Sequence, residues 1–362
     1  MLTPKAKRNI SRITPFAIIW LLSGWIADIV NIGEAYSQNH NPDTAIAFTI
    51  PVLIFASLAN FFVGLIIGAL EVIYLEKRFS DLTLGAKFFY KFLIYLAFFI
   101  IIIVVFFPVA SYLETGISLL EADAWQKLGR FLISGSFLVT LFQLSVRLVV
   151  CLTYSAISEN LGHHVLLNFL TGKYHRPKKE ERIFMFLDMK HSTTIAEKIG
   201  HERYFNLLKD YYNLMSDPII NSLGEVYQYI GDEVVITWDA VNGLKDNNCL
   251  KCFRDIKENM NDHADAFRKK YGLAPGFKAG LHIGDVTTGE IGALKKEIFY
   301  TGDVLNTTAR VQELCNENHT DLILTSDLLN RLDTPNQWPS EYIGELPLKG
   351  KANPVKLYKM NL

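Results

Sequence analysis

The feature that most constrains this chain is a run of ten large apolar side chains, residues 98–107, built only from Phe, Ile and Val. A helix of a soluble protein needs one polar face, whereas a helix surrounded by lipid does not. Four segments of this kind are long enough to cross a bilayer: 14–32, 47–75, 88–113 and 130–156. The sequence therefore predicts an α-helical transmembrane domain of four helices.

Composition supports an uneven division of the chain. Of the 362 residues, 50% are hydrophobic, and the long apolar runs lie almost entirely before residue 157. We expect a transmembrane domain over 1–156, a signalling helix and linker over 157–181, and a globular domain over 182–362. The formal net charge of −1 argues against a nucleic-acid partner, because bulk positive charge drives that binding. Four cysteines are too few for a disulfide framework.

The basic residues predict the orientation of the spans. Lys and Arg are concentrated before the first span and between the second and third, whereas residues 33–44 carry none and the loop after the third span is mainly acidic. Such residues stay on the cytoplasmic side. We therefore expect a multi-pass protein of the inner, cytoplasmic membrane with both termini in the cytoplasm. The first span lacks a small-residue cleavage site and should be retained.

Charged residues within the predicted spans include Asp28, Glu71 and Arg147. Intramembrane charges are costly and often functional. Glu71 and Arg147 lie toward the cytoplasmic ends of their spans, so we expect either an ion pair between them or snorkelling toward the interface. The sequence names no ligand for the membrane domain.

An apolar stripe at helical spacing follows the fourth span, ending near Leu170 before Gly172 and Pro177. It predicts one helix continuing from the fourth span through Leu170. Such a helix would pair with its own copy in a dimer. The alternative is an amphipathic helix on the globular domain or the membrane surface.

The globular half predicts an α+β fold with two acidic positions near each other. An apolar strand over 182–188 ends on Asp188, and the apolar segments of 225–239 are joined at Gly231-Asp232, which predicts a β-hairpin. If these strands are neighbours, the two carboxylates converge. Hard oxygen ligands with open water positions suit Mg²⁺ or Mn²⁺ bound to a nucleoside triphosphate. Either Asp alone is also ordinary turn chemistry.

Five motifs in order make residues 182–358 resemble the class III adenylate and guanylate cyclases. They are the segment 186–193 around Asp188, Ile230-Gly231-Asp232, the glycine-bearing segments 280–284 and 289–292, the segment 302–310 with Asn306 and Arg310, and Leu348-Lys349-Gly350. The order and spacing of the set are more specific than any single motif.

The resemblance implies a ferredoxin-like antiparallel sheet and two-metal catalysis at a homodimer interface. Asp188 and Asp232, with the backbone carbonyl of Met189, would hold two divalent metal ions, Mg²⁺ or Mn²⁺. Asn306 would hold the ribose, Arg310 would stabilise the transition state, and Lys349 would neutralise the outer phosphates. In this family the metal carboxylates come from one subunit and the other three side chains from its partner.

The base-selecting positions depart from the family pattern. Adenylate cyclases usually place Lys four residues before the second metal Asp, where this chain has Gln228, and Asp or Thr seven residues before the Asn, where it has Phe299. The guanylate pattern of Glu and Cys is also missing. Gln228 both donates and accepts hydrogen bonds, and Phe299 packs only. Thr301 would reach the base if its strand were bulged.

Three functions follow from the sequence. The first is a membrane-anchored adenylate cyclase that converts ATP to cyclic AMP, and the second is the same enzyme using GTP or both nucleotides. The third is a receptor or dimerisation module without turnover, which retention of the five motif residues disfavours. A diguanylate cyclase is a weaker alternative, because only Gly231-Asp232-Glu233 of its signature is present.

Overall fold

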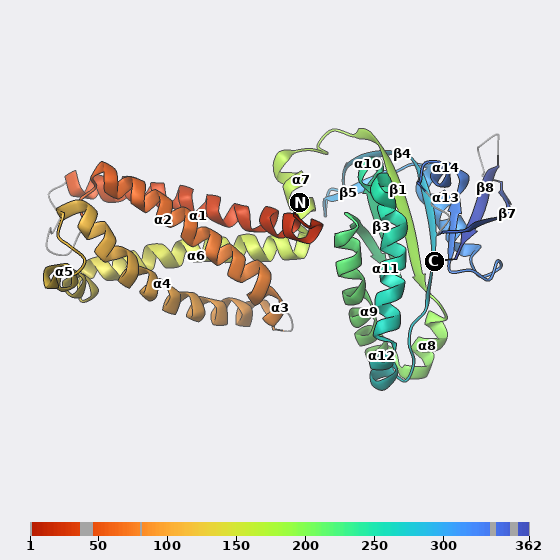
Figure 1. Ribbon diagram of the computed structural model, residues 1–362, viewed down its shortest axis with the longest axis horizontal. Helices are drawn as coiled ribbons and strands as arrows, with labels where there is room; N and C mark the ends of the chain where they lie inside the picture. Colours follow the sequence, from red (N-terminus) through yellow and green to blue (C-terminus); the bar gives the residue numbers. More distant parts are fainter. Residues whose placement is uncertain (1, 37–45, 80–81, 334–337, 348–353, 362) are drawn as a thin grey trace. The chain divides into compact units, whose positions relative to one another are not determined.

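Figure 1 shows the computed structural model of the chain, which describes residues 2–36, 46–79, 82–333, 338–347 and 354–361. The chain divides into two compact units. The N-terminal unit contains Ala6–Leu167, and the C-terminal unit contains Asn168–Leu362.

Four long helices of the N-terminal unit confirm the predicted spans. They are α1 (Pro4–Tyr36), α2 (Ile50–Ala69), α4 (Leu84–Thr115) and α6 (Gly135–Leu161), and α2 continues through the π-helix η1 (Leu70–Leu75) into α3 (Glu76–Arg78). The segments long and apolar enough to cross a membrane are Pro4–Ile32, Ile50–Leu75, Leu84–Thr115 and Gly135–Leu161. Their shared interior is built from large side chains such as Trp20, Ile67, Tyr95, Phe99 and Leu148.

A helix that the sequence analysis treated as a loop joins the third and fourth spans. This helix, α5 (Ala122–Leu132), packs Leu128 and Phe131 inward, and the Phe131 ring stacks on Phe107 with centroids 4.5 Å apart. Its apolar residues recur at helical spacing, but acidic residues around them hid that pattern.

The expected ion pair between Glu71 and Arg147 is wrong. The Glu71 carboxylate, 1% exposed, pairs with the Lys91 ammonium and also accepts hydrogen bonds from Tyr95 Oη and Ser155 Oγ, each at 3.2 Å. Arg147 instead donates to Asn60 Oδ1 at 3.1 Å. The π-helix that begins at Leu70 lies at Glu71, and such turns are frequent at functional sites.

The continuous helix predicted from the fourth span through Leu170 is also wrong. Helix α6 ends at Leu161, Gly162 has φ 84° and ψ 134°, and a separate helix α7 covers His163–Thr171. Gly162 therefore interrupts the helix despite the unbroken apolar stripe.

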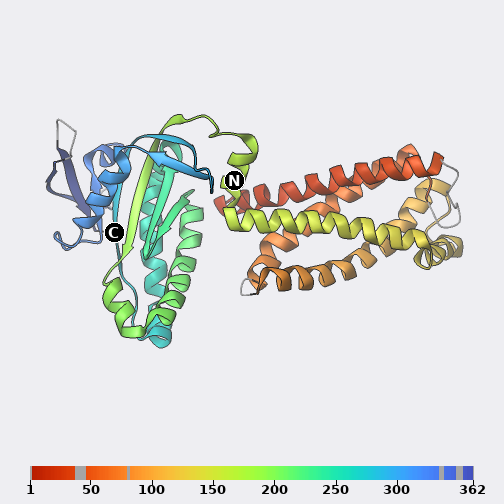
Figure 2. The ribbon, with the colours of Figure 1, turned by 180° about the vertical axis from the view of Figure 1, so that it is seen from behind.

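The C-terminal unit is built on a sheet with the strand order β2-β3-β1-β4-β6-β8-β7, and β5 pairs with β4 (Figures 1 and 2). The predicted antiparallel sheet is confirmed, with one parallel pair, β4 and β6. The strands are β1 (Lys178–Met189), β2 (Glu225–Ile230), β3 (Glu233–Asp239), β4 (Phe277–Ile291), β5 (Glu297–Thr301), β6 (Leu322–Thr325), β7 (Ser340–Leu346) and β8 (Val355–Met360).

Both faces of β1 are covered, which explains its unbroken apolar run. Ile183, Met185 and Leu187 point toward the core under helices α9 (His201–Asn221) and α11 (Asn248–Asp262). Phe184 and Phe186 point to the opposite face, toward α13 (Asp303–Glu313) and β5. Asp188 follows the same alternation, so its side chain belongs to the α13 face.

The remaining helices refine the sequence interpretation. The helical segment that follows β3 is divided into α10 (Ala240–Leu244), the 3₁₀ turn η2 (Lys245–Asn247), α11 and α12 (Ala264–Tyr271). The breaks lie at Asn247, which has a positive φ of 56°, and at His263. The helices α8 (Ser192–Ile199) and α14 (Ser326–Leu329) complete the unit.

Helix α13 lies directly on β4 because the strand carries glycine at the contact. A Cβ atom on Gly280 would lie 2.5 Å from Gln312 N and 2.8 Å from Thr308 O. Backbone atoms cannot yield to such an overlap, so Gly280 fixes how closely α13 approaches the sheet.

Candidate active site

Asp188 and Asp232 meet at one edge of the sheet, as the sequence predicts. Strand β1 pairs antiparallel with β3, and Leu187 lies opposite Val234. The residues that follow Leu187 and precede Val234 therefore share that edge. Gly231, with φ 65°, makes the turn that places Asp232 there, and Tyr212 Oη supports the turn by donating to Gly231 O at 3.0 Å.

The electrostatics of these residues show how close the carboxylates are. Burial, followed by the neighbouring Asp232 carboxyl, raises the pKa of Asp188. Burial, followed by Asp188 and Asp232, also raises the pKa of Glu233 to about 7. Because negative charge nearby disfavours the ionised forms of Asp188 and Glu233, a cation bound here would stabilise the site.

Two further side chains hold Asp188, and the sequence analysis missed both. Gln312 Nε2 on α13 donates to Asp188 Oδ2 at 3.1 Å, and Lys278 Nζ on β4 lies 3.6 Å from the same oxygen. Lys278 is opposite Asp188 in the β1–β4 register. Spacing along the chain does not reveal this pair, because it depends on the register between two strands.

The residues present fit a divalent metal site of the expected kind. Asp232 Oδ2 is buried and has no hydrogen-bond partner in the part of the chain that the structure describes. Met189 buries its side chain in the core, so only its backbone carbonyl is left as a ligand. The described residues contain no group of three or more His, Cys, Asp or Glu side chains that would hold a metal. A site with two carboxylates and one carbonyl leaves positions open for water and substrate oxygens.

A polar cleft of about 590 Å³ adjoins Asp188. It is lined by residues of the turn 188–194, by Lys278 and by Cys315, Asn316, His319 and Thr320. The first turn of α8 borders it, and His191 before that helix has a positive φ of 58°. Backbone N–H groups at a helix N-terminus favour anionic groups.

Asn306 and Arg310 share one exposed face of α13, one turn apart. Neither side chain forms a hydrogen bond or ion pair with the described residues. Gln312, which reaches Asp188, follows Arg310 by two positions and therefore points roughly 200° away around the helix at about 100° per residue. Arg310 consequently faces away from the carboxylates of its own chain, and Asn306, six positions before Gln312, points about 120° from it.

The predicted base-recognition residues lie on β2 and β5. Gln228 is exposed and directly follows a register shift between Val226 and Gln228. Phe299 is 43% exposed, and Thr301 is exposed on the same face of β5. The β4–β5 register runs regularly from Thr287 opposite Thr301 to Ile291 opposite Glu297, so the bulge considered for Thr301 is not present there.

Lys349 lies outside the described residues, between β7 and β8.

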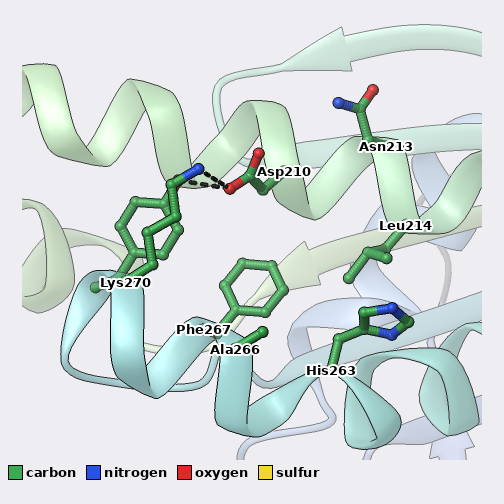
Figure 3. A pocket seen from close by; sticks show the side chains of 8 residues that line it. Asp210, Asn213, Leu214, His263, Ala266, Phe267 and Lys270 are labelled. Carbon is green, nitrogen blue, oxygen red and sulfur yellow. Dashed lines mark hydrogen bonds and ion pairs between the residues drawn. The ribbon is translucent and has the colours of Figure 1, made fainter.

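A second, smaller pocket on the helical layer contains none of the predicted site residues. There the Asp210 carboxylate accepts from Lys270 Nζ and Tyr271 Oη at 2.7 Å (Figure 3).

Comparison with known proteins identifies the C-terminal unit. The family described as adenylate and guanylate cyclase catalytic domain matches residues 175–361. The chain belongs to this family. Its C-terminal unit is therefore a nucleotidyl cyclase domain, and the resemblance inferred from the five motifs is confirmed.

Curated relatives of this cyclase domain are adenylate cyclases. Adenylate cyclase 2 of Rhizobium meliloti (strain 1021) is 37% identical over 204 residues, which cover 56% of this chain and 56% of that protein. The adenylate cyclase of Anabaena cylindrica is 23% identical over 179 residues, covering 49% and 36%. The chain thus spans little more than half the length of its relatives, or less.

A solved bacterial light-regulated adenylyl cyclase shares the fold. It superposes with a TM-score of 0.53 at 21% identity, covering 64% of this chain and 67% of that one. At this sequence identity the similarity supports the fold of the cyclase domain and nothing about its activity.

Proposed function

We propose that this chain is a membrane-anchored adenylate cyclase that converts ATP to 3′,5′-cyclic AMP and pyrophosphate at a homodimer interface. In this reaction the ribose 3′-oxygen loses its proton and bonds to the α-phosphorus. The bond from that phosphorus to the β-phosphate oxygen breaks, and pyrophosphate leaves. The observation that carries the proposal is the half-buried pair Asp188 and Asp232, in which the buried Asp232 Oδ2 has no hydrogen-bond partner among the described residues.

Each site residue has one role in this reaction. Two divalent cations, Mg²⁺ or Mn²⁺, held by Asp188, Asp232 and the carbonyl of Met189, would lower the pKa of the 3′-hydroxyl and neutralise the triphosphate. The Arg310 guanidinium stabilises charge on the α-phosphoryl oxygens. Asn306 orients the ribose, and Lys349 binds the outer phosphates.

The dimer follows from where the side chains point. Arg310 and Asn306 are exposed on α13 and point away from Gln312, by roughly 160° and 120°, whereas Gln312 contacts Asp188. A single chain therefore offers carboxylates in one place and the phosphate-binding arginine in another. In a two-fold dimer, the carboxylates of each copy can meet the arginine of the other copy, which creates two equivalent sites.

The membrane topology is part of the same proposal. The concentration of Lys and Arg in the first turns of α1 and from α3 to the first turns of α4 supports a cytoplasmic location of both termini, where ATP is available. In a bacterial cell this is the inner membrane. The ligand of the helical bundle stays unassigned.

ATP is the proposed substrate because the curated relatives are named adenylate cyclases. Gln228 and Phe299 match neither the adenylate nor the guanylate pattern, which keeps GTP as the second candidate substrate. Gln228 is exposed beside a bulge, where its amide can present either a donor or an acceptor to a purine.

The test uses the full-length protein purified in detergent. It is incubated with Mn²⁺ and either ATP or GTP, and the products are separated by chromatography. We expect cyclic AMP from ATP. Cyclic GMP alone would reassign the substrate, and no product from either nucleotide would favour a non-catalytic receptor or dimerisation module.

A further inference from the structure

The Asp188 carboxylate is held by two donors that bind the same oxygen atom. Gln312 Nε2 is 3.1 Å from Oδ2 and Lys278 Nζ is 3.6 Å from it. The donors come from different elements, α13 and β4, and both are largely buried: Gln312 is 4% exposed and the Lys278 side chain 11%. Their positions are fixed by packing and do not depend on a flexible surface chain.

This arrangement distinguishes the two oxygens of Asp188. The Gln312 amide hydrogen-bonds to Oδ2, and the Lys278 ammonium lies at ion-pair distance from the same oxygen, so both groups are on the Oδ2 side of the carboxylate. Oδ1 is left to bind a cation. The two donors thereby set the rotation of the carboxylate before any cation arrives, which is the usual task of groups behind a metal ligand.

The charge of Lys278 has a second consequence. Its ammonium lies 3.6 Å from Asp188 Oδ2, so a positive charge is already in place beside the carboxylate that would bind the metal. A divalent ion bound at Asp188 would lie a few ångströms from this ammonium. Their repulsion opposes binding of the free ion, whereas a metal–triphosphate complex brings negative charge that offsets it.

We propose that Lys278 and Gln312 are positioning residues for the metal site, and that Lys278 makes the site selective for a metal–nucleotide complex over the free metal ion. The inference rests on the proposed function, because it assumes that Asp188 binds the substrate's metal. It adds a physical reason for this selectivity: one buried lysine weakens binding of the free ion.

The experiment is a titration of the full-length protein in detergent with Mn²⁺ alone, followed by electron paramagnetic resonance of the unbound ion. Asp188→Ala identifies which bound Mn²⁺ belongs to this site. Lys278→Met should bind Mn²⁺ about tenfold more tightly than the wild type, a change of about 1.4 kcal/mol that is modest for one like charge removed at short range. Lys278→Arg, which keeps the charge, should bind as the wild type does.

A matched control is Lys359→Met, which removes an ammonium paired with Glu341 on the outer strands β7 and β8. Its Mn²⁺ affinity should equal that of the wild type. Gln312→Leu removes the neutral donor without changing charge, so we expect Mn²⁺ to bind several-fold more weakly. An unchanged or weaker affinity in Lys278→Met would overturn the proposal.

Two precautions keep the test decisive. If Lys278→Met does not fold, Lys278→Gln removes the same charge while keeping a polar side chain and should also tighten Mn²⁺ binding; no tightening would count against the proposal. The titration requires no turnover. A shift in Lys278→Met without any cyclic nucleotide from the wild type would therefore refute the proposed function and leave the metal inference standing.

Discussion

The two units of this chain treat buried charge in opposite ways. In the N-terminal unit, Glu71 is enclosed by Lys91, Tyr95 and Ser155, and Arg147 is bound by Asn60. In the C-terminal unit, Asp232 keeps a buried oxygen without a partner among the described residues, and Lys278 acts on both Asp188 and Glu233. Satisfied charges hold helices together in lipid, whereas incompletely neutralised charges mark the place where a cation and a substrate bind.

The largest effect on activity should come from a substitution in the C-terminal unit, where charged side chains lack partners in the described part of the chain. Arg310→Ala should lower cyclase activity by about 10³-fold or more, because a guanidinium on the transferred phosphoryl group is worth 10³–10⁵ in rate. Its unfolding temperature should not change, since Arg310 is exposed. Arg268→Ala on α12, also exposed, is the matched control and should keep full activity. Loss of activity accompanied by unfolding would deny Arg310 a chemical role.

Breaking a satisfied intramembrane pair should instead reduce stability. Lys91→Met leaves Glu71 buried without its cation, and such single removals cost about 3–5 kcal/mol. Unfolding of the protein in detergent measures the loss. The more exposed pair of Lys87 and Glu159 provides the control: Lys87→Met should cost less than about 1 kcal/mol. Similar costs in both variants would mean that burial does not distinguish the pairs.

The crowded carboxylates predict that stability falls as the pH rises, whereas a carboxylate in an ion pair would make stability rise with pH. The folded-state pKa of Glu233 is raised to about 7, so the folded protein binds its proton more tightly than the unfolded chain does. Stability without metal should therefore fall as the pH rises from about 4.5 to 7.

Glu233→Gln tests this sign directly. With a chelator at pH 8 it should raise the unfolding temperature by about 2 °C, since Glu233 is only half-buried and solvent screens it to roughly 1 kcal/mol. At pH 5 the variant and the wild type should unfold together. A destabilised variant at pH 8 would show that Glu233 is paired rather than repelled.

The smallest effect concerns base choice. Phe299→Thr introduces a hydroxyl at the position where adenylate cyclases usually carry a polar residue. The ratio of ATP to GTP turnover should rise by about fivefold, the value of one hydrogen bond near 1 kcal/mol. Competition between the two nucleotides measures the ratio. No change would mean that Phe299 does not approach the base.

Much of this architecture could be predicted from the sequence, because apolar length and strand composition are local properties. The four spans and the hairpin carrying Asp232 follow from such patterns. The break at Gly162 could not be predicted, since the apolar stripe continues across it and only backbone geometry interrupts the helix.

The partners of charged residues were the least predictable feature. Glu71 and Arg147 lie at similar depths in their spans, which would allow an ion pair between them. The direction of the Glu71 side chain and the packing of the helices instead bring Glu71 to Lys91. Lys278 and Gln312 reach Asp188 through the β1–β4 register and the close approach of α13 at Gly280. The pairing of Glu71 and the contacts of Asp188 both depend on tertiary packing, which cannot be read from the spacing of residues in one sequence.

The central claim is that a complete site needs two chains, and co-expression of Asp188→Ala with Arg310→Ala tests it most directly. Each variant alone should be inactive. Mixed dimers contain one site with both an intact Asp188 and an intact Arg310, so random pairing should restore about a quarter of wild-type activity. Co-purified mixed dimers without activity would contradict the shared site and require both residues to act within one chain.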